Sequence, residues 1–405
     1  MMFALISFCA SLKPVILVPG TYASVLQFTG SNSDLQWYCP KEFDHETVWV
    51  AEEYFIPPVL NCLTQWIAVK YDNKTNTQTS MSGYDVDVLD FGHVSGVTHL
   101  DRFVFNISFI PYFSKLVKVF HNHGYADDIT IFGAPHDWRF GISNQEVLWP
   151  RLKDLIETVH KSTGEKAILL GHSFGGFVVH HFISNIAPSR YSEEWLKEHV
   201  DRGIELSPSF GGAGSAVEYA YLRALHYVIE IKWDLLAETL ESMGCIHTHF
   251  PNYELQKLHG DPTVIIDPTG KEYKASEVPQ FLIDHQKING DNIKLLNLMV
   301  PYLKEPPKPS LVKEIVFYNS RRETTTGIMI GDWDKDSSVT KIIGRGDGTV
   351  MADNIEAYCD YIANSNLTKC IDLNDDSLMG SHFEMLFDSD KLEQFYQATL
   401  YDDYK

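Results

Sequence analysis

The sequence predicts an α/β protein whose sheet is mostly parallel and is covered by helices on both faces. Two observations lead to this prediction: short runs rich in Val, Ile and Leu end at glycine or turn residues, and segments with helical spacing lie between them. Strands that are apolar throughout are typical of a sheet buried on both faces. Their alternation with helices favours parallel pairing, with the functional site at the carboxyl ends of the strands.

Each expected strand has its own signal. The run KPVILVPG at Lys13–Gly20 stops at a Pro-Gly turn, and ITIFG at Ile129–Gly133 and KAILLG at Lys166–Gly171 stop at glycine. A fourth strand is expected to include Ile204–Leu206, and VKEIVFY at Val312–Tyr318 is the fifth. Helical patterns between the strands predict helices at Tyr112–His121, Glu146–His160 and Gly176–Asn185.

Two stretches break this alternation, and we interpret both as insertions on a single domain that spans residues 13–405. Residues from about 36 to 80 hold two cysteines and three tryptophans and end in a polar loop. Residues from about 212 to 310 mix helical and loop patterns and close in a Pro-rich segment. The core is therefore expected to come from the strands outside these stretches.

The charge balance excludes one class of partner. Lys and Arg number 33 and Asp and Glu number 54, which gives a net charge of −21 at pH 7. Such a field repels the phosphate backbone, so we expect no nucleic-acid binding.

The N-terminus predicts export. Residues 1–12 form an apolar run that ends in small residues before the first charge at Lys13, as in a secretory signal peptide. The alternative is a first buried strand. Three Asn-x-Ser/Thr sequons fit an exported glycoprotein. They lie at Asn73, Asn106 and Asn366.

The cysteines predict at least one disulfide and one free thiol. One of the six lies in the signal, and an odd number cannot all pair. We favour a disulfide between Cys39 and Cys62. A disulfide between Cys359 and Cys370 is a second possible pair, and Cys245 would then be the free thiol. The spacing matches no zinc pattern, so we expect no metal site.

Gly171–Gly175 reads GHSFG and fits the G-x-S-x-G pattern of a nucleophile elbow. An apolar strand precedes it and a helical segment follows it, which is the context the elbow needs. The tight turn exposes the Ser173 hydroxyl beside helical N–H groups that favour developing negative charge. The alternative is a glycine-rich turn with an incidental serine. We predict that Ser173 is a nucleophile on an α/β-hydrolase fold.

Such a serine needs a base and an acid, which follow it in the chain order Ser, acid, His. Asp347 lies in a glycine-rich loop after the last predicted strand, and His382 follows it. An acid among glycines can also be a simple turn residue. Asp353 and Asp360 are rival acids, and Glu384 is a weaker one.

Five motifs together resemble the lecithin:cholesterol acyltransferase family, and most of all the lysosomal phospholipase A that also transfers acyl chains. They occur in compatible order from Lys13 to about Phe387. The motifs are PVILVPG, GAPHDWR (Gly133–Arg139), GHSFGG, GDGTV (Gly346–Val350) and HFEML (His382–Leu386).

The resemblance implies a role for particular residues. Ser173, Asp347 and His382 fall on the family's catalytic triad. The backbone N–H groups of Thr21 and Phe174 would form the oxyanion hole, which stabilises the tetrahedral intermediate more than the starting ester.

The resemblance also implies a lipid-contacting insertion and a cap. Cys39 and Cys62 sit where the family closes a disulfide loop beside the site, and the segment after about residue 212 would form the cap and lid. An apolar loop suits an enzyme that lifts a lipid from a surface. The alternative is that its residues form the insertion's own small core. The expected contacts are Val48, Trp49, Val50, Phe55 and Ile56, with Trp49 the foremost.

Two features limit what is carried over. Asp137 and Arg139 flank Trp138 in GAPHDWR, and we expect them to lock a loop rather than to take part in catalysis. The lysosomal relative has an acid at the position of Thr21, and Thr21 cannot titrate, so we transfer no acidic pH optimum. Both the exterior and a lysosome- or vacuole-like lumen stay open as locations.

The function expected is therefore that of a serine phospholipase A or O-acyltransferase. It would pass an acyl chain from a glycerophospholipid in a membrane or lipoprotein to water or an alcohol, without a cofactor. The alternatives are a triacylglycerol lipase and a non-catalytic lipid-binding protein on the same fold.

Overall fold

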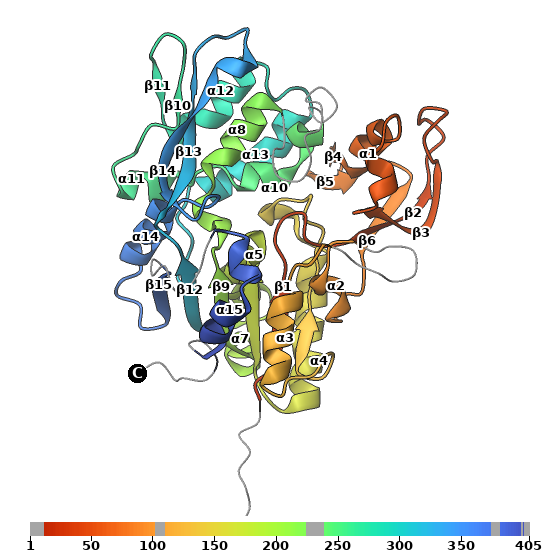
Figure 1. The fold of residues 1–405 in the computed structure, drawn as a ribbon, viewed down its shortest axis with the longest axis vertical. Coiled ribbons are helices and arrows are strands. Elements are labelled where there is room, and N and C mark those ends of the chain that lie inside the picture. The colour runs from red at the N-terminus through yellow and green to blue at the C-terminus, as the bar shows by residue number, and fades with distance from the viewer. Residues whose placement is uncertain (1–11, 102–109, 224–238, 374–380, 398–399, 401–405) are drawn as a thin grey trace, which may run out of the picture.

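The structure, a computed structural model, describes most of the chain (Figure 1). The expected signal peptide and the sequon at Asn106 lie outside the described residues, so nothing is concluded about either. No helix in the described part is long and apolar enough to cross a bilayer. The described residues are 12–101, 110–223, 239–373, 381–397 and 400.

A six-stranded parallel sheet forms the centre of the molecule, in the order β15-β12-β9-β8-β1-β7. All five expected strands are present, although β9 begins four residues earlier than the segment we singled out. The edge strand β15 was not expected. The strands are β1 (Val15–Val18), β7 (Ile131–Gly133), β8 (Ala167–His172), β9 (Val200–Leu206), β12 (Lys313–Tyr318) and β15 (Thr368–Asp372).

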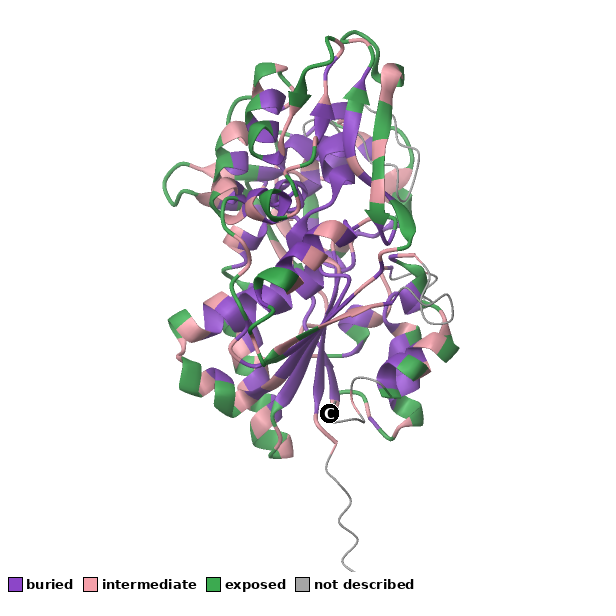
Figure 2. Cartoon of the chain, turned by 90° about the vertical axis from the view of Figure 1, so that its left-hand side faces the viewer, coloured by how far each residue is buried: buried purple, intermediate pink, exposed green. Residues whose placement is uncertain are grey.

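The two faces of this sheet pack against different helices, which confirms the expected α/β-hydrolase architecture. In β1, Ile16 and Val18 face a core shared with α4 and α5, whereas Val15 and Leu17 face α3 and α15. Figure 2 shows most strands of the central sheet buried between these layers, whereas the edge strand β15 is only partly buried. The helices are α3 (Ser114–Asn122), α4 (Leu148–Thr163), α5 (Phe174–His181), α14 (Ala352–Tyr361) and α15 (Ser389–Tyr396).

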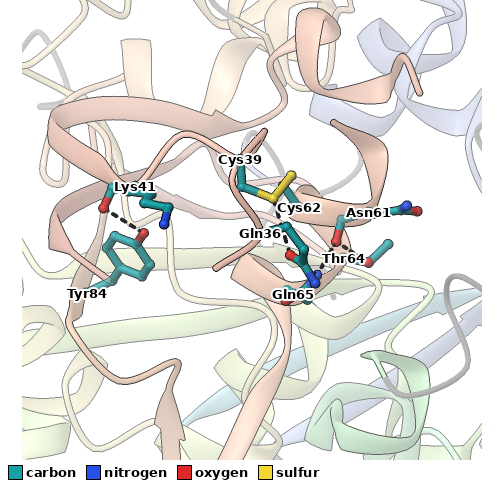
Figure 3. The surroundings of a disulfide bond; sticks show 8 residues. All are labelled: Gln36, Cys39, Lys41, Asn61, Cys62, Thr64, Gln65 and Tyr84. Carbon is teal, nitrogen blue, oxygen red and sulfur yellow. Dashed lines mark hydrogen bonds between the residues drawn. A yellow bond between two sulfur atoms is a disulfide. The ribbon is translucent and has the colours of Figure 1, made fainter. Parts of the chain in front are cut away.

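The first of the two irregular stretches forms a small unit beside the central sheet, and this unit is larger than the expected 36–80. Its three-stranded antiparallel sheet runs β3-β2-β6 and begins at Leu26. The Cys39–Cys62 disulfide, which we favoured, joins the loop before β3 to α1 (Figure 3). The elements are β2 (Leu26–Ser31), β3 (Glu42–Trp49), α1 (Leu60–Ile67), β4 (Val69–Asp72), β5 (Thr77–Ser80) and β6 (Tyr84–Val88).

The second irregular stretch lies above the carboxyl ends of the central strands, and a later segment completes it. Strands β13 and β14 follow β12 and pair with β10 and β11 in a separate sheet, ordered β11-β10-β13-β14. We call the described helices α8, α10, α11, α12 and α13 together with β10, β11, β13 and β14 the cap. Its elements are α8 (Gly214–Leu222), α10 (Gly244–Thr248), α11 (Tyr253–Leu258), β10 (Ile265–Ile266), β11 (Glu272–Tyr273), α12 (Val278–Asp284), α13 (Asn292–Leu303), β13 (Arg322–Ile330) and β14 (Val339–Gly346).

The remaining described elements are short. Cys359 and Cys370 form a second disulfide, between α14 and β15, and Cys245 is a buried free thiol. The short helices include α2 (Ser95–Thr98), α6 (Ala187–Arg190), α7 (Glu193–His199), a π-helical continuation of α5 (Phe182–Ile186), and 3-10 turns at Glu52–Phe55, Ile142–Asn144, Ser209–Gly211, Ala275–Glu277, Asp336–Ser338 and Glu384–Leu386.

Candidate active site

Ser173 sits on a strained turn between β8 and α5. Its backbone has φ 58° and ψ −123°, outside the regions that non-glycine residues favour. The Ser173 N–H donates to the carbonyl of Leu206 at 2.9 Å, which ties the turn to the end of β9. Strain held in place by neighbouring strands is typical of a functional position.

Two glycines make this turn possible. A Cβ on Gly171 would lie 2.2 Å from the carbonyl oxygen of Gly175, and one on Gly175 would lie 2.1 Å from that of Val18. These separations are far below van der Waals contact. The motif therefore needs glycine at both positions because backbone approaches backbone there.

His382 and Asp347 are joined by two hydrogen bonds. The His382 Nδ1–H donates to Asp347 Oδ2 at 2.7 Å, and the His382 backbone N–H donates to the Asp347 carbonyl at 2.9 Å. Both side chains are almost fully buried. Because Nδ1 carries the proton toward Asp347, Nε2 is left as the basic nitrogen of the ring.

The environment of Asp347 favours its ionised form. Burial alone would raise its pKa, but His382 and the backbone N–H groups of Val350 and Thr349 lower it below the ordinary value. Those N–H groups donate to Oδ1 at 2.7 and 2.8 Å. Asp347 is therefore a fixed carboxylate that orients the imidazole.

The rival acids have other partners. Asp353 pairs with Arg345 at 2.8 Å, and Glu384 accepts the backbone N–H of Ser381 at 2.7 Å. Asp360 is exposed on α14. All four candidate acids lie in the described part of the chain, and of these only Asp347 contacts the His382 ring.

Ser173 and His382 line one cavity of about 320 Å³ beneath the cap, and its walls are mostly apolar. Thr21 also lines it. Tyr22 has φ 64° in a turn closed by the Ala23 N–H donating to the Gly20 carbonyl at 3.2 Å. Phe174, the first residue of α5, bears one of the N–H groups that a helix start leaves without an intrahelical partner.

Tyr112 and His172 are site residues that the sequence reasoning missed. Tyr112 lines the same cavity, and His172 is buried beside Ser173. Tyr112 Oη is 2.6 Å from His172 Nδ1, and His172 Nε2 is 2.9 Å from the carbonyl oxygen of His382. The Gly20 N–H donates to Tyr112 Oη at 3.0 Å. The only sequence signal was the presence of His172 inside the GHS motif.

The buried Arg139 forms a fork with the partly buried Asp137, and their contacts match the loop-locking role we expected. Arg139 Nε and Nη2 donate to the two carboxylate oxygens of Asp137 at 2.9 and 2.6 Å. Arg139 also donates to Ser80 Oγ at 2.8 Å and to the Trp66 carbonyl at 3.4 Å. The fork thus joins the loop after β7 to the unit that holds the Cys39–Cys62 disulfide.

The expected lipid contacts need correction. Val48, Trp49 and Val50 are buried, and the Trp49 indole N–H donates to the Tyr22 carbonyl at 2.9 Å. These three residues belong to the core, where the end of β3 packs inward and Trp49 contacts Trp138. Phe55 is half-buried, and Ile56 is 64% exposed.

One large apolar side chain of this unit that we did not choose is almost fully open to solvent. Trp37 is 90% exposed and lies just before Cys39, outside the loop that the Cys39–Cys62 disulfide closes.

One buried cluster has side chains of the types that can ligate a metal. His180, Glu205 and Glu314 gather between α5, β9 and β12, within 4.8 Å of one another. His180 Nδ1 donates to Glu314 at 2.7 Å, and Glu314 also accepts from Thr368 at 2.8 Å. Burial alone would lower the pKa of His180, but Glu314 and Glu205 raise it to about 10. We therefore interpret the cluster as an imidazolium–carboxylate pair with Glu205 protonated, because burial raises the pKa of Glu205.

Comparison with known proteins agrees with the geometry. Residues 43–224 match the family model described as lecithin:cholesterol acyltransferase. The resemblance to the lecithin:cholesterol acyltransferase family is confirmed. The match includes the nucleophile elbow at Ser173 and ends before Asp347 and His382, so these two assignments rest on geometry.

Two curated relatives illustrate the similarity to this family. The chain is 30% identical over 203 residues to the phosphatidylcholine-sterol acyltransferase of Oryctolagus cuniculus, covering 50% of this chain and 44% of that protein. It is 26% identical over 206 residues to the lysosomal phospholipase A and acyltransferase of Rattus norvegicus, covering 50% and 48%. The matched region thus spans less than half of either relative.

A solved structure matches nearly the whole fold. The match is to a chain in the crystal structure of the Tle4–Tli4 complex, with a TM-score of 0.54 and 12% identity. It covers 95% of this chain and 98% of that chain. At this identity the likeness concerns the fold alone.

Proposed function

We propose that this chain is a serine acyl ester hydrolase and O-acyltransferase that acts on glycerophospholipids. The observation that supports this most is the convergence of three segments distant in sequence. Ser173 on its strained turn and His382 line the same cavity, and Asp347 holds the His382 ring from behind. Similarity to acyltransferases and phospholipases supports the lipid substrate class.

In the proposed reaction His382 Nε2 takes the proton of Ser173 Oγ as this oxygen attacks the acyl carbonyl. The N–H groups of Thr21 and Phe174 would stabilise the tetrahedral oxyanion. His382 then returns the proton to the departing lysolipid oxygen, leaving an acyl-serine. Water or an alcohol, deprotonated by His382, attacks the acyl-serine and releases a fatty acid or an acylated acceptor.

We further propose that Trp37 and Ile56 contact the lipid surface, in place of the buried Trp49. Both are large apolar side chains exposed on the unit that holds the Cys39–Cys62 disulfide, and an indole at a membrane interface is favourable. Trp37→Ala is expected to weaken sedimentation with phosphatidylcholine vesicles about tenfold and to leave hydrolysis of a small soluble ester unchanged. Trp49→Ala should lower both, because it removes packing in the core.

The proposed location is an exported compartment, outside the cell or in an acidic lumen. Two disulfides fit an oxidising environment. The sequons at Asn73 and Asn366 are exposed, and glycosylation at both is part of the proposal. Mobility on a gel before and after enzymatic deglycosylation of secreted protein tests it.

One experiment tests the proposed reaction. The protein is incubated with phosphatidylcholine vesicles, with and without ceramide or sterol, at pH 5 and pH 7.5, beside Ser173→Ala. Lysolipid should appear only with the unaltered serine, and an acylated acceptor would establish transfer. Full activity of Ser173→Ala would refute the nucleophile assignment. A fluorophosphonate that labels the unaltered protein but not the variant provides an independent readout.

A second candidate substrate class is neutral lipid. Among the described residues that line the cavity there is no Lys, Arg, Asp or Glu to pair with a phosphate headgroup. We therefore include triacylglycerol vesicles in the same incubation. Release of fatty acid from triacylglycerol, without lysolipid from phosphatidylcholine, would favour a lipase.

A further inference from the structure

A directional chain of buried hydrogen bonds connects the separate parts of the candidate site. The Gly20 N–H can only donate, so Tyr112 Oη accepts it and donates its own proton to His172 Nδ1. With Nδ1 accepting, the His172 proton lies on Nε2, which donates to the His382 carbonyl at 2.9 Å. Every proton in this series of bonds therefore has one position.

Burial keeps these groups neutral. His172 is fully buried, and desolvation together with the neighbouring His382 lowers its pKa to about 3. Burial raises the pKa of the Tyr112 hydroxyl. Neither group changes protonation state between pH 5 and pH 9, so the direction of the hydrogen bonds is fixed over that range.

The residues joined in this way border the three proposed catalytic groups. Gly20 immediately precedes Thr21, His172 immediately precedes Ser173, and the last acceptor is the backbone of His382 itself. These segments follow β1, end β8 and precede α15, so the hydrogen bonds connect parts of the site that are distant in sequence. A buried donor or acceptor that loses its partner is destabilising, so each bond resists displacement of its segment.

We propose that Tyr112 and His172 are positioning residues. They fix the distance between the oxyanion turn, the nucleophile and the general base without touching the substrate's reacting atoms. This inference rests on the proposed function. It predicts that loss of either residue lowers kcat, because misplacement of catalytic groups by about 1 Å reduces rates by about 100-fold.

The test uses Tyr112→Phe, which deletes one oxygen atom, with Tyr253→Phe as the matched control. Tyr253 is also buried, and its hydroxyl makes no hydrogen bond within the described residues. Hydrolysis of a soluble p-nitrophenyl ester is measured per active site titrated with a fluorophosphonate. Tyr112→Phe should lower kcat about 10- to 100-fold and leave KM within about twofold, and Tyr253→Phe should match the unaltered protein.

Two further variants distinguish positioning from simple stability. His172→Gln can accept from Tyr112 and donate to the His382 carbonyl, and should retain most of kcat, whereas His172→Leu should resemble Tyr112→Phe. The double variant Tyr112→Phe/His172→Leu should be no slower than His172→Leu alone, because both changes break the same series of hydrogen bonds.

The outcomes separate the two proposals. Unchanged kcat in Tyr112→Phe, or additive losses in the double variant, would overturn the positioning role while an inactive Ser173→Ala upheld the proposed function. An active Ser173→Ala would overturn the function itself. If Tyr112→Phe does not fold, the comparison of His172→Gln with His172→Leu decides the matter: equal losses would overturn the positioning role.

Discussion

Asp347→Asn should abolish most of the activity while leaving the fold intact, for a reason that the hydrogen bonds determine. Oδ1 accepts two backbone N–H groups, at 2.8 and 2.7 Å, and Oδ2 accepts the His382 Nδ1–H at 2.7 Å. Asparagine has a single carbonyl oxygen, and the two backbone donors would hold it at the Oδ1 position. The amide NH₂ would then face His382 Nδ1.

This reversal changes the tautomer of His382. A donor opposite Nδ1 requires Nδ1 to accept, so the ring proton moves to Nε2 and the ring can no longer take the proton of Ser173. The same exchange in a serine protease triad lowers kcat by about 10⁴, equivalent to about 5.5 kcal/mol of barrier. We expect a loss of this size in kcat for a soluble p-nitrophenyl ester at pH 7.5.

Asp353→Asn is the matched control, because Asp353 pairs with Arg345 at the surface rather than with His382. It should retain full kcat, and circular dichroism should show both variants folded. Retention of more than a tenth of the activity by Asp347→Asn, or a comparable loss in Asp353→Asn, would refute the assignment of the acid.

Two further predictions concern stability. Glu205→Gln should match the unaltered protein in stability near pH 5 and become relatively more stable toward pH 9. Burial raises the pKa of Glu205 well above its ordinary 4.5. The unaltered protein therefore loses stability as the pH rises through that raised pKa, and the variant does not. Glu314→Gln should instead lose about 3–5 kcal/mol, and urea unfolding at pH 5, 7 and 9 measures both. If Glu205→Gln were strongly destabilised at every pH, Glu205 would be ionised in the fold. Replacing Cys39 and Cys62 by serine should cost about 3 kcal/mol in the free energy of unfolding, and a shift in melting temperature near zero would contradict this.

The sequence was most informative where a residue type has one structural use. Continuous apolar runs predicted the central strands β1, β7, β8 and β12, because a strand covered on both faces admits little else. GHSFG predicted the turn at Ser173, because backbone approaches backbone there and only glycine fits. The order Ser, acid, His predicted the pairing of Asp347 with His382.

It was least informative where burial depends on distant partners. Trp49 was expected at a surface, yet Trp138, some ninety positions away in the chain, covers it. Strand β15 is an edge strand with partly exposed residues, and it has no apolar run to indicate it. Tyr112 and His172 likewise became a unit only when the fold brought them together.

Asp347 follows β14 directly, and β14 belongs to the sheet of the cap. After β12 the chain leaves the central sheet, crosses the cap and returns to deliver the carboxylate beside His382. The cap strand β14 and the acid loop are therefore continuous in the chain. A cap that is inserted between two core elements could be exchanged by itself, but this one could not. A chimera that takes its cap from a relative must take the residues from Arg322 to Val350 as well, so substrate range and the acid loop would be inherited together.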